Sequence, residues 1–203
     1  MNWQELSALL VLASAMSFTP GPNTTLSTAL AANRGLRHAL PFVFAVPLGW
    51  SALLLVCAMG LGALLLAVPL LAWAVKLIGA VYLLWLAWKL SQTRQLGEAN
   101  DANLSVGFWQ GVALQFVNIK AWMLALAIVS GWIAGRADPV QRLMVVVPVM
   151  MVFAFASNLL YALAGSLLRN WLTGPAGTGR RLVWCNRSMA LVLVVTAIWM
   201  LTL

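Results

Sequence analysis

The chain consists mostly of apolar blocks, each long enough to cross a lipid bilayer as a helix. A helix needs about 20 apolar residues to span a hydrocarbon layer of about 30 Å at 1.5 Å per residue. Transmembrane barrel strands would alternate polar and apolar residues over about ten positions, and these blocks do not alternate. The sequence therefore predicts an all-α integral membrane protein with six transmembrane helices, over residues 5–31, 41–67, 70–90, 108–133, 143–168 and 183–202.

The composition supports a membrane domain rather than a soluble one. Hydrophobic residues make up 63% of the 203 residues and charged residues 8%, whereas soluble domains carry about 25% charged residues. We therefore interpret residues 1–203 as a single transmembrane domain embedded in the lipid bilayer. The N-terminus has no basic segment and no evident cleavage site, so we expect the first block to stay in the mature protein.

The net charge of +8 indicates topology rather than a nucleic-acid partner, because the basic residues are scattered through short connections between the blocks. Eight of the twelve Lys and Arg residues fall on one side of the predicted helices. The positive-inside rule then places the N-terminus and the C-terminus on the periplasmic side. These eight residues are Arg34, Arg37, Lys89, Arg94, Arg169, Arg180, Arg181 and Arg187.

The connection over residues 91–107 divides the six blocks into two sets of three. Because three is an odd number, two homologous halves would insert with opposite orientations, which is the inverted-repeat plan of many secondary transporters. Residues 18–23 can be set against residues 116–121 at corresponding places of the two halves. We expect two inverted three-helix repeats, over residues 1–95 and 105–203.

The first block contains Pro20, Gly21, Pro22 and Asn23 where the bilayer centre should be. Two prolines two residues apart remove two backbone donors, so the helix must open at this point. Open backbone at membrane depth has to be buried in protein or line a wet cavity, and half-helix ends are where transporters hold substrates. The alternative is a proline kink that only shapes packing. We favour a substrate-binding segment formed by these four residues.

Polar side chains also interrupt the later blocks. Gln115, Asn118 and Lys120 fall within six residues of the fourth block, and Lys120 lies far from either end. Burying a lysine at that depth costs about 3 kcal/mol on insertion scales, so a cavity is favoured over the alternative, a snorkelling side chain. Asn118 and Lys120 share a face only if the helix is distorted between them. Asn158 in the fifth block is a further candidate for the site, although such residues also connect helices by hydrogen bonds.

The sequence gives no support for an enzyme. Acidic residues lie only at the ends of blocks or in connections, and His38 is the single histidine. Cys57 and Cys185 lack the spacing of metal ligands, and neither a G-x-S-x-G segment nor a P-loop is present. We therefore expect no metal, no cofactor and no catalytic residue, and any energy must come from a gradient or from the substrate.

Three motifs in order, Pro20-Gly21-Pro22-Asn23, Gly107-Phe-x-x-Gly111 and Asn118-x-Lys120-Ala121, together resemble the LysE/RhtB family of bacterial amino-acid exporters. The fourth block is similar to the branch that includes the cysteine and O-acetylserine exporter. The LysE/RhtB family usually has Asn-Pro-Lys in the fourth block, whereas this chain has Ile119 in place of the proline. A break of the helix in this block would therefore have to be held by Asn118, Lys120 and their neighbours. The resemblance implies efflux of small amino acids from the cytoplasm to the periplasm, across the bacterial inner membrane and driven by the proton gradient.

These observations lead to one hypothesis for the site. The amides of the first break, Asn23 and Lys120 would hold the carboxylate of a neutral amino acid, while Asn118, Gln115 and Asn158 would bind its amine or side chain. Protons would travel on Lys120 or on the substrate. A passive channel and a structural subunit of a larger complex are the alternatives, and a homodimer is compatible with such a thin bundle.

Overall fold

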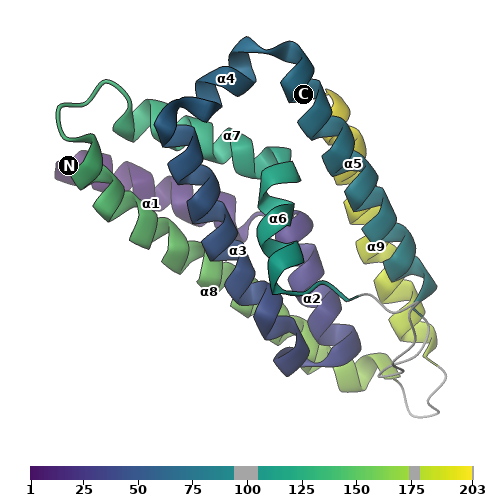
Figure 1. Cartoon of the computed structure of the whole chain (residues 1–203). Coiled ribbons are helices and arrows are strands. Elements are labelled where there is room, and N and C mark those ends of the chain that lie inside the picture. Colours follow the sequence, from purple (N-terminus) through teal and green to yellow (C-terminus); the bar gives the residue numbers. More distant parts are fainter. Residues whose placement is uncertain (94–104, 174–178, 203) are drawn as a thin grey trace.

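The computed structural model describes residues 1–93, 105–173 and 179–202 (Figure 1). Regular structure in these residues is entirely helical, as predicted. Arg94 and the end of the first predicted repeat at residue 95 lie outside the described residues. The helices are α1 (Trp3–Phe18), α2 (Pro22–Arg34), α3 (Leu36–Val56), α4 (Gly62–Ala67), α5 (Pro69–Gln92), α6 (Phe108–Val117), α7 (Ile119–Ile128), α8 (Pro139–Thr173) and α9 (Arg180–Thr202), with π-helical turns at Cys57–Leu61 and Val129–Ile133.

Five of the predicted membrane spans have counterparts in the structure. Four continuous helical stretches of the described chain are long and apolar enough to cross a membrane, and a fifth arises if the bent pair of α6 and α7 is taken as one span. The first block is instead divided into α1, of 16 residues, and α2, of 13 residues. The chain is therefore a multi-pass membrane protein, and the count of six spans stays a prediction. The four stretches are Leu36–Ala67, Pro69–Gln92, Pro139–Leu172 and Arg180–Thr202.

The first predicted span breaks where its two prolines predict. Helix α1 ends at Phe18, and Thr19 continues in extended backbone with φ −68° and ψ 129°. Helix α2 begins at Pro22, a position where proline loses no hydrogen bond because the first amide of a helix has no acceptor within that helix. The amide of Gly21 donates to the Thr24 hydroxyl at 3.0 Å. Proline at the first position of α2 and the hydrogen bond from Gly21 to Thr24 therefore stabilise the break.

The fourth span breaks as well, although no proline lies there. Asn118 leaves the helix with φ −94° and ψ 101°, and α6 and α7 meet at a bend of 68°. The side-chain oxygen of Asn118 accepts the amide N–H of Lys120 at 3.2 Å, which caps the start of α7. The indole N–H of Trp122 donates to the carbonyl of Phe116 at 2.8 Å, so one open end of α6 also has a partner. Because Ile119 replaces a proline, the sequence alone did not decide whether the helix breaks here.

Glycines allow the half-helices to pack closely against the long helices. A Cβ atom on Gly165 of α8 would lie 2.3 Å from the carbonyl oxygen of Thr28 in α2. One on Gly79 of α5 would lie 2.0 Å from the carbonyl oxygen of Val117, the last residue of α6. Small residues at such contacts are typical of membrane bundles, because they let backbones approach. These contacts fix α2 against α8 and the end of α6 against α5.

Several helix ends lie toward one edge of the molecule (Figure 1). Helices α2 and α5 end, and α9 begins, toward one edge of the molecule, where several of the basic residues lie (Figure 1). Both ends of the chain lie away from that edge. The membrane orientation and the inverted repeat stay predictions.

Candidate functional site

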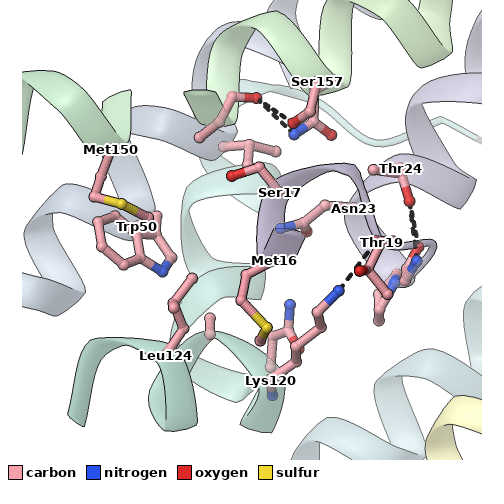
Figure 2. A pocket seen from close by; sticks show the side chains of 17 residues that line it. Met16, Ser17, Thr19, Asn23, Thr24, Trp50, Lys120, Leu124, Met150 and Ser157 are labelled. Atoms are coloured by element: carbon pink, nitrogen blue, oxygen red, sulfur yellow. Dashed lines mark hydrogen bonds between the residues drawn. The ribbon is translucent and has the colours of Figure 1, made fainter. Parts of the chain in front are cut away.

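The two breaks face one cavity of about 70 Å³, which lies between α1, α2, α3, α7 and α8 (Figure 2). About 10–15 Å³ of such space is enough for one water molecule, so the cavity has room for a small solute rather than a large one. It is lined by Met16, Ser17, Thr19, Gly21, Pro22, Asn23, Thr24, Val46, Trp50, Asn118, Lys120, Ala121, Leu124, Met150, Ala154, Ser157 and Asn158.

Six of the eight predicted site residues line this cavity, and two do not. Pro20 and Gln115 lie outside its lining. Asn118 and Lys120 both line it although they are two residues apart, because the bend between α6 and α7 brings them to one side, which is the distortion that a shared face requires. Whether the six bind a substrate stays a prediction.

Lys120 connects the second break to the first. Its Nζ atom donates to the carbonyl oxygen of Thr19 at 3.1 Å, at the open C-terminal end of α1. The hydroxyl of Tyr161 in α8 donates to the neighbouring carbonyl of Phe18 at 3.0 Å. A cation at a helix C-terminus is stabilised by the helix dipole. The Lys120 ammonium group therefore has a defined partner within the fold.

Asn23 and Gln115 form a reciprocal amide pair that joins α2 to α6. The Asn23 Nδ2 atom donates to Gln115 Oε1 at 2.9 Å, and Gln115 Nε2 donates back to Asn23 Oδ1 at 3.1 Å. Gln115 also donates to the carbonyl of Gly111 at 3.0 Å and is fully buried. Gln115 thus supports Asn23 from behind, and Asn23 is the member of the pair that reaches the cavity.

Asn158 is held in α8 by two bonds. It accepts the hydroxyl of Ser27 at 2.8 Å, and its Nδ2 atom donates to the carbonyl of Ala154 at 2.8 Å. Its side-chain oxygen has a second lone pair that these contacts leave for another donor. Ser157, beside it, also lines the cavity.

The electrostatic character of the cavity favours an anionic group. Helices α2 and α7 both begin at it, and helix N-termini carry partial positive charge. Lys120 adds a full positive charge, and none of the lining residues is acidic. The ion pairs of Arg142 with Glu5, at 3.2 Å, and with Asp138, at 2.7 Å, involve residues outside the lining. Within the described ranges, no group of three His, Cys, Asp or Glu side chains could hold a metal.

Sequence reasoning missed the apolar wall of the cavity, which includes Trp50, Leu124 and Met150. Apolar residues in a membrane helix look alike whether they face lipid or a cavity. The one available signal was the position of Trp50, which lies within the second block, whereas Trp3 and Trp88 lie near the ends of blocks as interfacial tryptophans do.

The profile of the LysE type translocator family matches residues 14–203. The chain belongs to this family. A LysE type chain is a transporter rather than an enzyme, as the sequence predicted. It is 30% identical over 193 residues to a protein of Salmonella typhimurium (strain LT2), and 30% identical over 198 residues to one of Escherichia coli (strain K12). Both are named cysteine/O-acetylserine efflux protein, and each alignment covers 95% of this chain and 95% of the relative. No solved structure gives a significant match to this LysE type chain.

Proposed function

We propose that this LysE type translocator exports small neutral amino acids, of the cysteine and O-acetylserine kind, from the cytoplasm to the periplasm. The observation that carries the proposal is the meeting of two helix breaks at one small cavity that is lined by a lysine and by no acid. The names of the relatives support the substrate class. The membrane is the bacterial inner membrane, with both termini periplasmic.

The substrate carboxylate would lie at the N-terminal end of α2, within reach of Lys120. In the structure the Lys120 ammonium donates to the neutral carbonyl of Thr19 at 3.1 Å. On binding, it would donate to the charged carboxylate instead, and a hydrogen bond between two charged groups is stronger than one to a neutral acceptor. Asn23 would contribute its amide from the other side, in an orientation fixed by Gln115. The ammonium of the substrate would use the side-chain oxygens of Asn118 and Asn158. No lining carboxylate is present to select a cationic side chain, so lysine and arginine are disfavoured as cargo.

The export would be driven by the proton gradient through antiport. Lys120 is the one titratable side chain that lines the described cavity, so the proton travels either on its ammonium or on the substrate. Lys120→Met separates these routes, because it removes the titrating group and keeps a long apolar stem. Lys76→Met in α5 is the matched control, since Lys76 lies over the Trp73 ring, at 5.2 Å, and outside the cavity.

Uptake of labelled cysteine into proteoliposomes, with and without an imposed proton gradient, tests the proposal. We expect saturable flux that the gradient accelerates, excess unlabelled O-acetylserine to compete, and lysine not to compete. Flux that neither saturates nor responds to the gradient would favour a passive channel, and a complete lack of flux would favour a structural subunit. Full gradient-driven flux in the Lys120→Met variant would assign the proton to the substrate.

A further inference from the structure

The cavity has a polar end and an apolar end, and the apolar end contains one donor without a partner. Figure 2 shows Trp50, Leu124 and Met150 gathered on the side of the cavity away from Lys120 and Thr19. Trp50 comes from α3 and is only 4% exposed, and its indole nitrogen has no hydrogen-bond partner among the described residues. Figure 2 shows this nitrogen on the edge of the ring that is turned toward Leu124. Trp50 therefore lines the cavity, and its unpaired N–H lies beside Leu124, another residue of the lining.

Trp50 differs in this respect from two other tryptophans that pack into the described bundle. Trp122 and Trp132 are also inside or partly inside the bundle, and each donates its indole N–H to a backbone carbonyl, at 2.8 Å and 2.9 Å. Buried tryptophan N–H groups usually have a partner, and an unsatisfied buried donor is costly. The unpaired N–H of Trp50 belongs to a residue that lines a cavity. Its energetic cost is explained if a ligand in the cavity supplies the missing acceptor.

We propose that Trp50 is a specificity-determining residue that donates a hydrogen bond to an acceptor atom on the substrate side chain. This inference rests on the proposed export of small neutral amino acids. With the carboxylate at the N-terminus of α2 and at Lys120, the side chain extends toward the apolar end, where Met150 and Leu124 enclose it. The substrate class is thereby narrowed to small neutral amino acids with one acceptor on the side chain, such as an ester or ether oxygen or a thiol sulfur, which is a weaker acceptor.

A pair of isosteric substrates tests the hydrogen bond directly. O-Methylserine and norvaline have side chains of the same length and differ only in an ether oxygen that replaces a methylene group. A site built to bond a polar group discriminates against the analogue that lacks it. In proteoliposomes with the wild-type protein we expect kcat/KM for O-methylserine to exceed that for norvaline about tenfold, which corresponds to about 1.4 kcal/mol.

Trp50→Phe removes the N–H group and keeps an aromatic ring. We expect this variant to lose the discrimination, because kcat/KM for O-methylserine falls toward that for norvaline while the norvaline value changes much less. Trp184→Phe is the matched control, since Trp184 lies on α9, is 68% exposed and does not line the cavity. It should keep the tenfold ratio.

The outcomes separate this inference from the function on which it rests. Equal loss of both substrates in Trp50→Phe would show that Trp50 only packs against the cavity, and would overturn the inference while export stands. Wild-type protein that transports both substrates equally would also overturn it, even if the variant fails to fold. Wild-type protein that transports neither these substrates nor cysteine would refute the proposed function, and the inference with it.

Discussion

Replacing Ile119 by proline should be tolerated, because the structure ends one helix and begins another at this position. Ile119 is the first residue of α7, so its amide is one that has no acceptor within the helix. Asn118 before it has φ −94° and ψ 101°, near the extended backbone that a residue preceding proline adopts. Proline is favoured as the first residue of a helix for these reasons.

The expected change in the free energy of unfolding is small because two terms oppose each other. Proline at a compatible position stabilises by about 0.4–1 kcal/mol through the unfolded chain. Ile119 is 6% exposed, and proline has one side-chain carbon fewer, which costs about 0.8 kcal/mol for a buried methylene group. The net change for Ile119→Pro should therefore lie within about 1 kcal/mol of zero.

Ala125→Pro is the matched control, because Ala125 lies in the interior of α7 and is fully buried. Proline there removes a helical hydrogen bond and clashes with the preceding turn, at a cost of about 3 kcal/mol or more. For a soluble chain of this size, 1 kcal/mol moves the unfolding midpoint by about 2–4 °C. Thermal unfolding in one detergent should place Ile119→Pro within about 4 °C of wild type and Ala125→Pro at least about 6 °C below it. Equal losses in the two variants would refute the break and indicate a continuous helix.

Three further predictions concern contacts outside the cavity. Gly165→Ala should abolish the monodisperse elution of the detergent-solubilised protein, because the new Cβ would lie 2.3 Å from a carbonyl oxygen of α2. Asn186→Leu should lower the free energy of unfolding by about 1–3 kcal/mol, because buried Asn33 loses both of its hydrogen bonds to the Asn186 amide, at 2.8 and 2.9 Å. Adding Asn33→Leu to the same chain should restore part of the loss, as measured by thermal unfolding. The guanidinium of Arg142 lowers the pKa of Asp138, so the stability from this pair is complete above the usual Asp value of about 3.9 and is lost as the pH falls through the lower folded value. The stability difference between wild type and Asp138→Asn should thus be constant from pH 8 to pH 5.

The two breaks differ in how far the sequence could predict them. Proline removes a donor wherever it stands, so the opening at Pro20 and Pro22 follows from the sequence alone. Asn118 can cap a helix but can also remain inside one, and the choice depends on distant contacts. Because Gly79 of α5 has no side chain, the carbonyl of Val117 at the end of α6 can occupy the space that a Cβ atom would fill. No local pattern around residue 118 contains that information.

The candidate site shows the same division between polar and apolar residues. Asn118 and Lys120 were predictable because a polar side chain in an apolar helix needs a partner. Gln115 was predicted as a direct contact, and the structure instead places it behind Asn23, a difference that depends on the packing of α2 against α6. Met123 and Leu124 are both apolar residues inside the fourth block, yet the first is 44% exposed and the second is 8% exposed and lines the cavity. Only the packed bundle distinguishes a cavity wall from a lipid-facing surface.

The hydrogen-bond balance of the cavity supports the proposed class of ligand. The open carbonyl ends at the breaks have partners from side chains, since Tyr161 bonds Phe18 and Lys120 bonds Thr19. The groups left to a ligand are mostly donors, namely the first-turn amides of α2, the remaining N–H groups of the Lys120 ammonium and the Trp50 N–H. A ligand that brings acceptors matches such a wall, and a carboxylate with a side-chain oxygen or sulfur brings them at both ends. A second ammonium group at the apolar end would instead meet an indole donor and two apolar side chains, and burying that charge without a partner is costly. The same arrangement would therefore favour the neutral amino acid that we propose as substrate over a basic one.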